Sequence, residues 1–211
     1  MSASPTVVRL SDVCHEYTTR RSTVTVLDHL DLSVGRGRIV GITGPSGTGK
    51  STLLRIVGGL ERPSVGAVTY ESGFSPWTPR GPRCSYPRAG FVMPVFQDPL
   101  ASLDPRWPIW RTLAEPRGLV GRAAREAARE SLGSLGLDHL DLNARPAELS
   151  GGQCQRIALL RALIAKPDLL IADEPTARQD LITAASIAEL IIRASQAGTA
   201  VVIVSHNAPW L

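Results

Sequence analysis

The sequence predicts an α/β fold in which helices cover a largely parallel sheet. A short apolar run at 38–42 enters a glycine-rich turn and is followed by apolar residues at helical spacing. Later, apolar strands at 169–172 and 199–204 alternate with helical patterns at 151–165 and 181–194. Strands that alternate with helices are typical of parallel sheets, because each crossover between parallel strands needs a helix-length connection.

Length and composition are typical of one globular domain. The chain has 211 residues, 43% of them hydrophobic, which is enough to bury a sizeable core. Its net charge of +4 comes from arginines scattered among acidic residues, so nucleic acid is not expected as a partner. The sequence shows no signal-peptide pattern and no apolar run of the roughly 20 residues that span a bilayer, so any membrane role is expected to be peripheral.

Cysteine usage favours a reducing cytoplasm. The three cysteines, Cys14, Cys84 and Cys154, lie far apart in the sequence and form no CxxC pair. This spacing suggests neither a disulfide framework nor a zinc site.

The chain is expected to open with two antiparallel strands joined by a polar turn at 18–22. The residues that indicate them are Val8, Leu10, Val13, Val24, Val26, Leu30, Leu32 and Val34. After the first helix, residues 71–90 are rich in proline and glycine and predict an irregular connection. From Asp98 to Glu148 the pattern is helical, most clearly at 122–135, which suggests a helical subdomain inserted into the α/β core.

The glycine-rich turn fits the phosphate-loop pattern GxxxxGK[ST] and lies between a predicted strand and a predicted helix. The nucleotide-binding residues predicted here are Gly44, Pro45, Ser46, Gly47, Thr48, Gly49, Lys50, Ser51 and Thr52. Backbone N–H groups and the positive end of the helix face one phosphate, while Lys50 supplies charge and Ser51 can hold Mg²⁺. The alternative is an incidental glycine turn, but the strand, lysine and hydroxyl together favour a nucleoside triphosphate.

Two carboxylates follow the apolar strand at 169–172. Ligands of open parallel sheets bind at the carboxyl ends of strands, so Asp173 is predicted to reach the Mg²⁺ shell. Glu174, one residue further, is placed to polarise an attacking water as a general base. An acidic pair after a buried strand is by itself more often a turn or a helix cap; with the phosphate loop, catalysis is favoured.

Ser150 and Gln153 form a capping-box pattern before an apolar helix. Capping leaves unexplained why Gly151 and Gly152 occupy the first turn, where glycine weakens a helix but exposes backbone N–H groups to an anion. The stretch Ser150–Gln153 is therefore predicted to be a second phosphate-binding helix end.

Over nearly its whole length the chain resembles the nucleotide-binding subunit of an ATP-binding cassette (ABC) transporter. The resemblance rests on Gly44–Thr52 as Walker A, Leu169–Glu174 as Walker B and Leu149–Gln153 as the family signature. It implies an α/β fold with a P-loop NTPase core of the ABC ATPase type, an N-terminal antiparallel β subdomain and an inserted helical subdomain. It also implies ATP hydrolysis with Mg²⁺, and a head-to-tail dimer in which each signature contacts the partner's ATP.

Three further residues match the family pattern. Gln97 matches the Q-loop glutamine, which approaches Mg²⁺ and water; His206 matches the switch histidine, which contacts the γ-phosphate. Tyr17 matches the aromatic residue that stacks on adenine, although a tyrosine in a β element is about as often part of the core. The expected division is 1–97 for the β subdomain and first part of the core, 98–148 for the helical subdomain and 149–211 for the rest of the core.

A subfamily is suggested by the segments 97–106 and 113–116, which resemble the ATPases of dipeptide, oligopeptide and nickel importers. These usually pair two different ATPase subunits, so the resemblance implies a heterodimer with a second ABC ATPase. It also implies two transmembrane permease subunits, a solute-binding protein and a peripheral location on the cytoplasmic side of the membrane.

The sequence departs from the family pattern in two places. A Ser-Ala-Leu-Asp D-loop is replaced by Ala177–Asp180, in which only Asp180 is kept, and the sequence ends soon after His206, where the family continues with further strands and a helix. Missing strands are expected to expose a sheet edge. A regulatory or non-transport ABC-type nucleotide-binding protein with weak or no ATPase activity is thus an alternative. A small-molecule kinase is disfavoured because it gives no role to residues 149–153.

Overall fold

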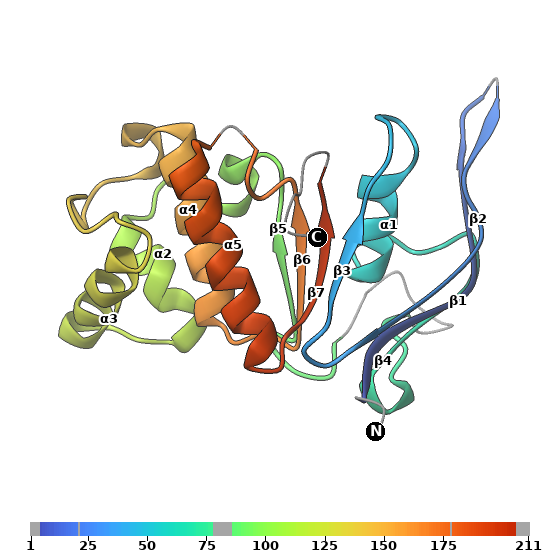
Figure 1. The fold of residues 1–211 in the computed structure, drawn as a ribbon, viewed down its shortest axis with the longest axis horizontal. Coiled ribbons are helices and arrows are strands. Elements are labelled where there is room, and N and C mark those ends of the chain that lie inside the picture. The colour runs from blue at the N-terminus through green and yellow to red at the C-terminus, as the bar shows by residue number, and fades with distance from the viewer. Residues whose placement is uncertain (1–4, 21, 78–85, 178, 206–211) are drawn as a thin grey trace.

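The computed structural model describes residues 5–20, 22–77, 86–177 and 179–205, which form two sheets with helices between and around them (Figure 1). The strands are β1 (Thr6–Thr18), β2 (Thr23–Gly35), β3 (Ile39–Ile42), β4 (Val65–Tyr70), β5 (Val92–Val95), β6 (Leu169–Asp173) and β7 (Ala200–Val204). The helices are α1 (Lys50–Val57), α2 (Ile109–Ala114), α3 (Gly121–Gly133), α4 (Gly151–Ile164) and α5 (Leu181–Gln196). Short 3-10 helices occupy Glu71–Gly73, Pro99–Ser102, Glu115–Arg117 and Pro146–Glu148.

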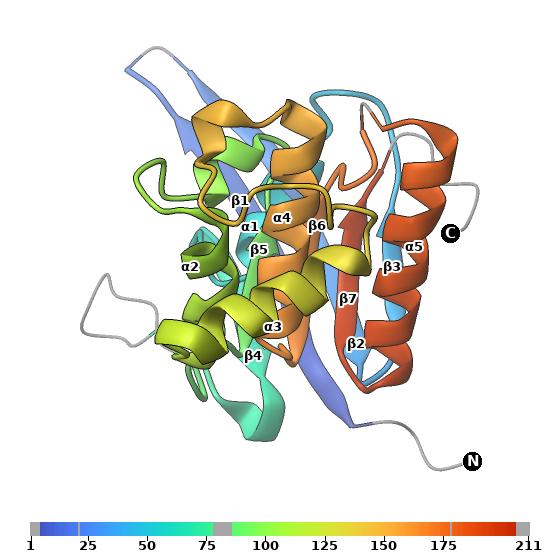
Figure 2. The same ribbon diagram turned by 90° about the vertical axis from the view of Figure 1, so that its left-hand side faces the viewer.

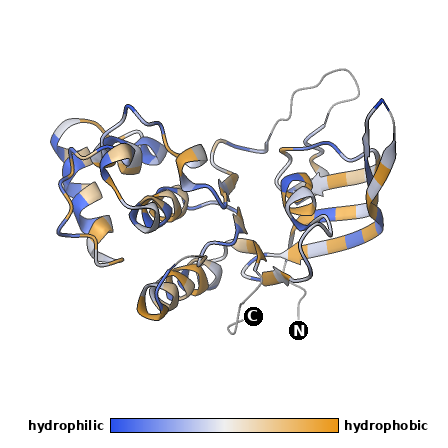
Figure 3. Ribbon diagram, turned by 90° about the horizontal axis from the view of Figure 1, so that it is seen from above, coloured by the Kyte–Doolittle hydropathy of each residue, from blue (hydrophilic) through white to orange (hydrophobic). Residues whose placement is uncertain are grey.

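The core sheet is parallel, as the alternation of strands and helices predicts, with the strand order β3-β7-β6-β5. It is buried on both faces, so its strands read as continuous apolar runs. Leu169 and Ile171 pack with α1 on one face, whereas Leu170 and Ala172 pack with α4 and α5 on the other. Seen from above, α1 lies between this sheet and the antiparallel one (Figure 3).

The antiparallel sheet has the order β2-β1-β4. Strands β1 and β2 confirm the predicted hairpin, but the side chains that β2 buries differ from the prediction. Val24 is 56% exposed, and Leu27, which the alternation did not include, is 6% exposed. One extra residue of β2 between Leu27 and Leu30 shifts the pairing with β1 and turns Leu27 to the buried face. A further shift between Leu27 and Thr25 puts Val24 opposite the half-exposed Tyr17, near the end of the hairpin.

Two strands were not predicted, and both carry a weak sequence signal. Strand β4 has only six residues and contains a glycine, and β5 has four residues and contains Pro94. A proline cannot donate to a sheet ladder and is tolerated at an edge, which is where β5 lies.

The segment expected to be helical carries α2 and α3, which pack against each other and against α4 in front of the parallel sheet (Figure 2). Its described residues contain no strand. Across the described ranges of the chain, no helix combines the length and the apolar character that crossing a membrane requires.

Candidate functional site

The carboxyl ends of the four parallel strands bring the predicted catalytic motifs to one edge of the sheet. Ile42 of β3 and Asp173 of β6 are both paired with Val204 of β7. Because neighbouring strands lie about 4.8 Å apart, the backbones of Ile42 and Asp173 lie about 10 Å apart across β7. Strand β5 ends beside β6, with Val95 paired to Ala172, so Gln97 follows at the same edge. His206, the next residue after Ser205, lies outside the described residues.

The phosphate loop closes on itself through Lys50. The buried Lys50 Nζ donates to the carbonyl oxygens of Gly44 and Pro45 at 2.9 and 2.6 Å, and the Thr48 hydroxyl donates to Pro45 O at 2.9 Å. Gly49 is the N-cap residue of α1, and no side chain caps this helix end. Its first N–H groups therefore have no side-chain acceptor, which is the arrangement that suits an anion.

Tyr17 lies beside the phosphate loop. It lines a hollow of about 260 Å³ together with Val26, Gly47, Gly49, Lys50, Ser51 and Thr52. Its hydroxyl lies 3.2 Å from Thr52 Oγ1 and donates to Glu61 Oε1 at 2.8 Å. Tyr17 is 39% exposed, so its hydroxyl is held by α1 while part of the residue remains accessible to a ligand.

Residues that the sequence did not single out hold Tyr17 in place. The ring of His15 meets the ring of Tyr17 edge-on at 4.8 Å, and its Nε2 lies 3.0 Å from Glu61 Oε1. Arg55 donates to both Tyr17 Oη and Glu61. Burial on its own would raise the pKa of Glu61, but the hydrogen bonds from Tyr17 and Arg55 outweigh it and hold that pKa below its usual value. Only the three-dimensional contact between β1 and α1 reveals these residues.

Glu174 has a backbone conformation that non-glycine residues seldom adopt. Its φ is 50°, in the left-handed region, directly after the apolar strand β6. Its N–H donates to Val204 O at 2.9 Å, and its carbonyl oxygen accepts from Ala177 N at 3.0 Å. Such conformations cost about 1–3 kcal/mol and concentrate at functional sites. This geometry turns the chain sharply just after Asp173 and leaves both carboxylates half-buried at the sheet edge.

The stretch Ser150–Gln153 forms the predicted capping box at the start of α4. Gln153 N donates to Ser150 Oγ at 3.2 Å, and Ser150 N donates to Gln153 Oε1 at 2.8 Å. The two glycines between them open onto a second hollow of about 280 Å³. Its lining residues are Gln97, Pro99, Gly151, Gly152, Gln155, Ala177 and Gln179. Gln97 therefore lies near the glycines of its own chain, in a hollow that shares no lining residue with the one at the phosphate loop.

The altered D-loop packs on this helix end. A Cβ added to Gly152 would lie 3.1 Å from Gln179 Oε1, so the Gln179 amide covers the glycine backbone. Asp180 caps α5 by accepting from the backbone N–H groups of Ile182 and Thr183 at 3.1 and 3.0 Å. Hydrogen bonds from Thr183, first from its backbone N–H and second from its hydroxyl in size of effect, hold the pKa of Asp180 below its usual value. Arg178 lies outside the described residues.

Comparison with known proteins gives consistent matches. Residues 27–177 match the model of the ABC transporter family. The lipoprotein-releasing system ATP-binding protein LolD 2 of Caulobacter vibrioides is 39% identical over 208 residues, covering 97% of this chain and 90% of that protein. The nickel import ATP-binding protein NikE of Escherichia coli is 35% identical over 212 residues, covering 96% of this chain and 78% of that protein.

A third relative and a solved structure agree with these. The probable D,D-dipeptide transport ATP-binding protein DdpF of Escherichia coli is 35% identical, covering 97% of this chain and 65% of that protein. A dimeric ATP-binding cassette solved in a post-hydrolysis state with ADP and Pi superimposes with a TM-score of 0.80 at 29% identity, covering 95% of this chain and 88% of that one.

Replacing Gly49 with alanine is expected to damage the phosphate loop. Gly49 has a φ of 87°, and an added Cβ would lie 2.6 Å from Val26 Cγ1 and 2.8 Å from Val26 O. The left-handed backbone costs about 1–2 kcal/mol, and displacing β2 adds about 1–3 kcal/mol. Gly118→Ala is the matched control, because Gly118 also has positive φ but has open space around it. Thermal unfolding should show a larger loss of stability for Gly49→Ala than for Gly118→Ala, and only Gly49→Ala should lose ATP binding. Equal losses of stability in the two variants would contradict the contact with Val26.

The capping role of Asp180 predicts a pH-dependent contribution to stability. Because the pKa of Asp180 is lower in the folded protein, this contribution is present above the unfolded pKa of about 3.9 and is lost as the pH falls through the folded pKa. Asp180→Ala should lower the thermal midpoint at neutral pH, and the difference from the wild type should shrink as the pH falls below the unfolded pKa of about 3.9. Asp180→Asn retains a capping oxygen, so its thermal midpoint should fall less than that of Asp180→Ala. A pH-independent difference would rule out the charged cap.

Proposed function

This chain belongs to the ABC transporter family, and we propose that its nucleotide is held by residues 44–52 and cleaved at the adjoining edge of the parallel sheet. It is an ATP-binding subunit, and its hydrolysis of ATP is coupled to transport. The observation that carries the site assignment is the register that aligns Ile42, Asp173 and Val204 at one edge. In the proposed site the phosphate-binding and acidic residues would face a shared space, which phosphoryl transfer to water requires.

The roles proposed for the residues follow from their chemistry. Lys50, now bonded to the carbonyl oxygens of its own loop, exchanges those partners for the outer phosphates of ATP. Tyr17 offers its accessible ring to the adenine. Glu174 polarises the attacking water, and His206 is proposed to contact the γ-phosphate.

The oxygen donors of the site fit Mg²⁺. The Ser51 hydroxyl in the first turn of α1, the Asp173 carboxylate and the Gln97 amide are the hard ligands that this ion prefers. They come from one edge of the sheet, and the half-buried Asp173 supplies the negative charge. When bound, Mg²⁺ would neutralise charge on the phosphates.

A dimer is proposed because the two phosphate-binding features of one chain line separate hollows. The helix end at Ser150–Gln153 would then contact the nucleotide of a second ATPase subunit. The related dimeric cassettes support this arrangement. The helical subdomain of residues 98–148 is proposed as a unit that links Gln97 to two permease subunits on the cytoplasmic side of the membrane.

The proposed cargo is a dipeptide, an oligopeptide or nickel, taken up with the help of a solute-binding protein and a second, different ATPase. The support is the segment at 97–106 and the similarity to DdpF and NikE. The sequence identity to LolD 2 is similar to the identities to DdpF and NikE, so lipoprotein release is the alternative to solute uptake.

A regulatory subunit with weak turnover is the second candidate, and one observation favours it. Gln179 lies on Gly152, where the family has a small or apolar D-loop residue, and so partly covers the helix end that a second ATPase would use. Turnover of the assembled protein separates the two candidates.

Replacing the proposed base tests the enzyme. Glu174→Gln keeps the shape of the side chain but not its basicity, so Mg²⁺-dependent ATP hydrolysis should fall about 100-fold or more while ATP binding persists. Glu130→Gln, an exposed residue of α3, is the matched control and should leave turnover unchanged. If the complete assembly hydrolyses ATP no faster than its Glu174→Gln form, the catalytic proposal fails and the regulatory candidate stands.

Purification from membranes tests the transporter assembly. Detergent extraction should recover this chain together with two permease subunits and a second ATPase, and reconstituted vesicles should accumulate a dipeptide, oligopeptide or nickel when ATP is supplied. The Glu174→Gln form should assemble but not transport. Lipoprotein release without solute uptake would replace the proposed cargo, and recovery without any membrane protein would contradict transport.

A further inference from the structure

Two β-bulges gather polar side chains in the antiparallel sheet, outside the motifs described above. The pairing of β1 with β2 gains one residue of β1 between Leu10 and Val13 and one residue of β2 between Leu27 and Leu30. Asp12 and His29 lie in these bulges, with left-handed φ angles of 52° and 46°. Bulges re-aim side chains, and here each strand contributes to one cluster.

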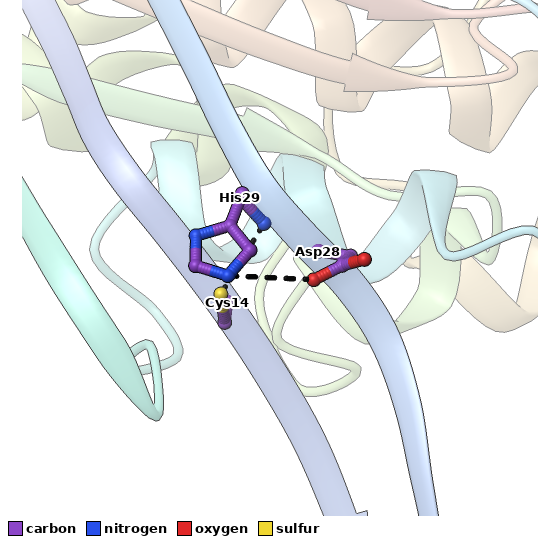
Figure 4. Close-up of side chains that lie close together, drawn as sticks. All are labelled: Cys14, Asp28 and His29. Carbon is purple, nitrogen blue, oxygen red and sulfur yellow. Dashed lines mark hydrogen bonds and ion pairs between the residues drawn. The ribbon is translucent and has the colours of Figure 1, made fainter.

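The cluster contains three side chains that can bind a metal ion, from two neighbouring strands (Figure 4). One ligand atom each of Cys14, Asp28 and His29 lies within 4.8 Å of the others, and this is the only such group among the described residues. His29 Nε2 is 3.8 Å from Asp28 Oδ1, and the backbone N–H of His29 donates to Cys14 Sγ at 3.2 Å. That N–H would also stabilise a thiolate.

A fourth residue orients the histidine. His29 Nδ1 lies 2.6 Å from Asp12 Oδ1, which leaves Nε2 on the side of Asp28. Histidines that bind metals in proteins usually donate their other ring N–H to a carboxylate, which fixes the tautomer and the ring orientation. Pairing of charges accounts for the two aspartates around His29 but gives no reason for the thiol beside them.

We propose that Cys14, Asp28 and His29 form a Zn²⁺ site, with Asp12 as the positioning residue for His29. Zinc accepts sulfur, nitrogen and oxygen ligands at about 2.0–2.3 Å, so tetrahedral ligands lie about 3.3–3.6 Å apart, a small closure from the observed separations. The thiol releases its proton to solvent as it binds. The side chains of Asp28 and His29 are 80% and 71% exposed, so a water completes the coordination.

The proposed site would join β1 to β2 close to the nucleotide hollow. Cys14 is followed by His15, whose ring contacts Tyr17. A metal at Cys14 therefore crosslinks the strand that presents the proposed adenine contact. The thiolate distinguishes this site from the oxygen-lined Mg²⁺ site, because Mg²⁺ avoids sulfur ligands.

Cobalt substitution tests the site on untagged, full-length protein. One Co²⁺ per chain should produce a thiolate-to-cobalt charge-transfer band with intense visible bands of tetrahedral geometry, and Zn²⁺ should bleach them while excess Mg²⁺ should not. Zn²⁺ should also raise the thermal midpoint. Cys14→Ser should abolish the charge-transfer band, and Asp28→Asn, at an exposed position where folding is not at risk, should weaken Zn²⁺ binding at least tenfold.

The chain supplies its own matched control. The tetrapeptide Leu-Asp-His-Leu occurs at 27–30 and again at 137–140, where His139 is exposed and belongs to no potential metal cluster formed by the described part of the chain. Asp138→Asn should leave Zn²⁺ affinity unchanged. A charge-transfer band that survives in Cys14→Ser, equal losses in Asp28→Asn and Asp138→Asn, or displacement by Mg²⁺ would each show adventitious binding and overturn the proposal.

Discussion

The site depends on the register of four parallel strands. Ile42, Val204 and Asp173 are aligned across three of them, and β5 ends at the same edge, two residues before Gln97. The register is strongly specified because β6 and β7 are buried on both faces, so a slip of one residue would exchange the side chains of two different packing layers. It would also move one motif about 3.3 Å along its strand. Apolar packing in the core thus sets distances between polar groups at the edge.

The antiparallel sheet does more than cover α1. Val26 of β2 lies against Gly49, so the strand limits the space available to the phosphate loop at the start of the helix. Tyr17 of β1 reaches Thr52 in the first turn of the same helix. The antiparallel sheet therefore forms the nucleotide hollow together with the phosphate loop and the start of α1.

The sequence was most informative where a motif is continuous along the chain. The strand, turn and helix around residues 38–57, the capping box at Ser150 and the strand before Asp173 all depend on local patterns, and the structure confirms them. Contacts between distant segments could not be predicted in this way. The packing of Gln179 on Gly152 depends on tertiary structure, and the bulge that turns Leu27 to the buried face interrupts the alternation on which strand prediction relies. The same bulge brings His29 to Cys14, which the spacing of cysteines alone did not indicate.

The arrangement of the two hollows bears on how the chain acts. The phosphate loop and the helix end at Ser150–Gln153 each present backbone N–H groups suited to an anion, but they share no lining residue. One nucleotide on one chain would use only the first, so the glycines of the second have a ligand only if another subunit presents it. Any such subunit meets Gln179 first, because that side chain already lies on Gly152. The amide must then either move away or become one of the donors, and this choice decides whether the altered D-loop hinders or assists closure.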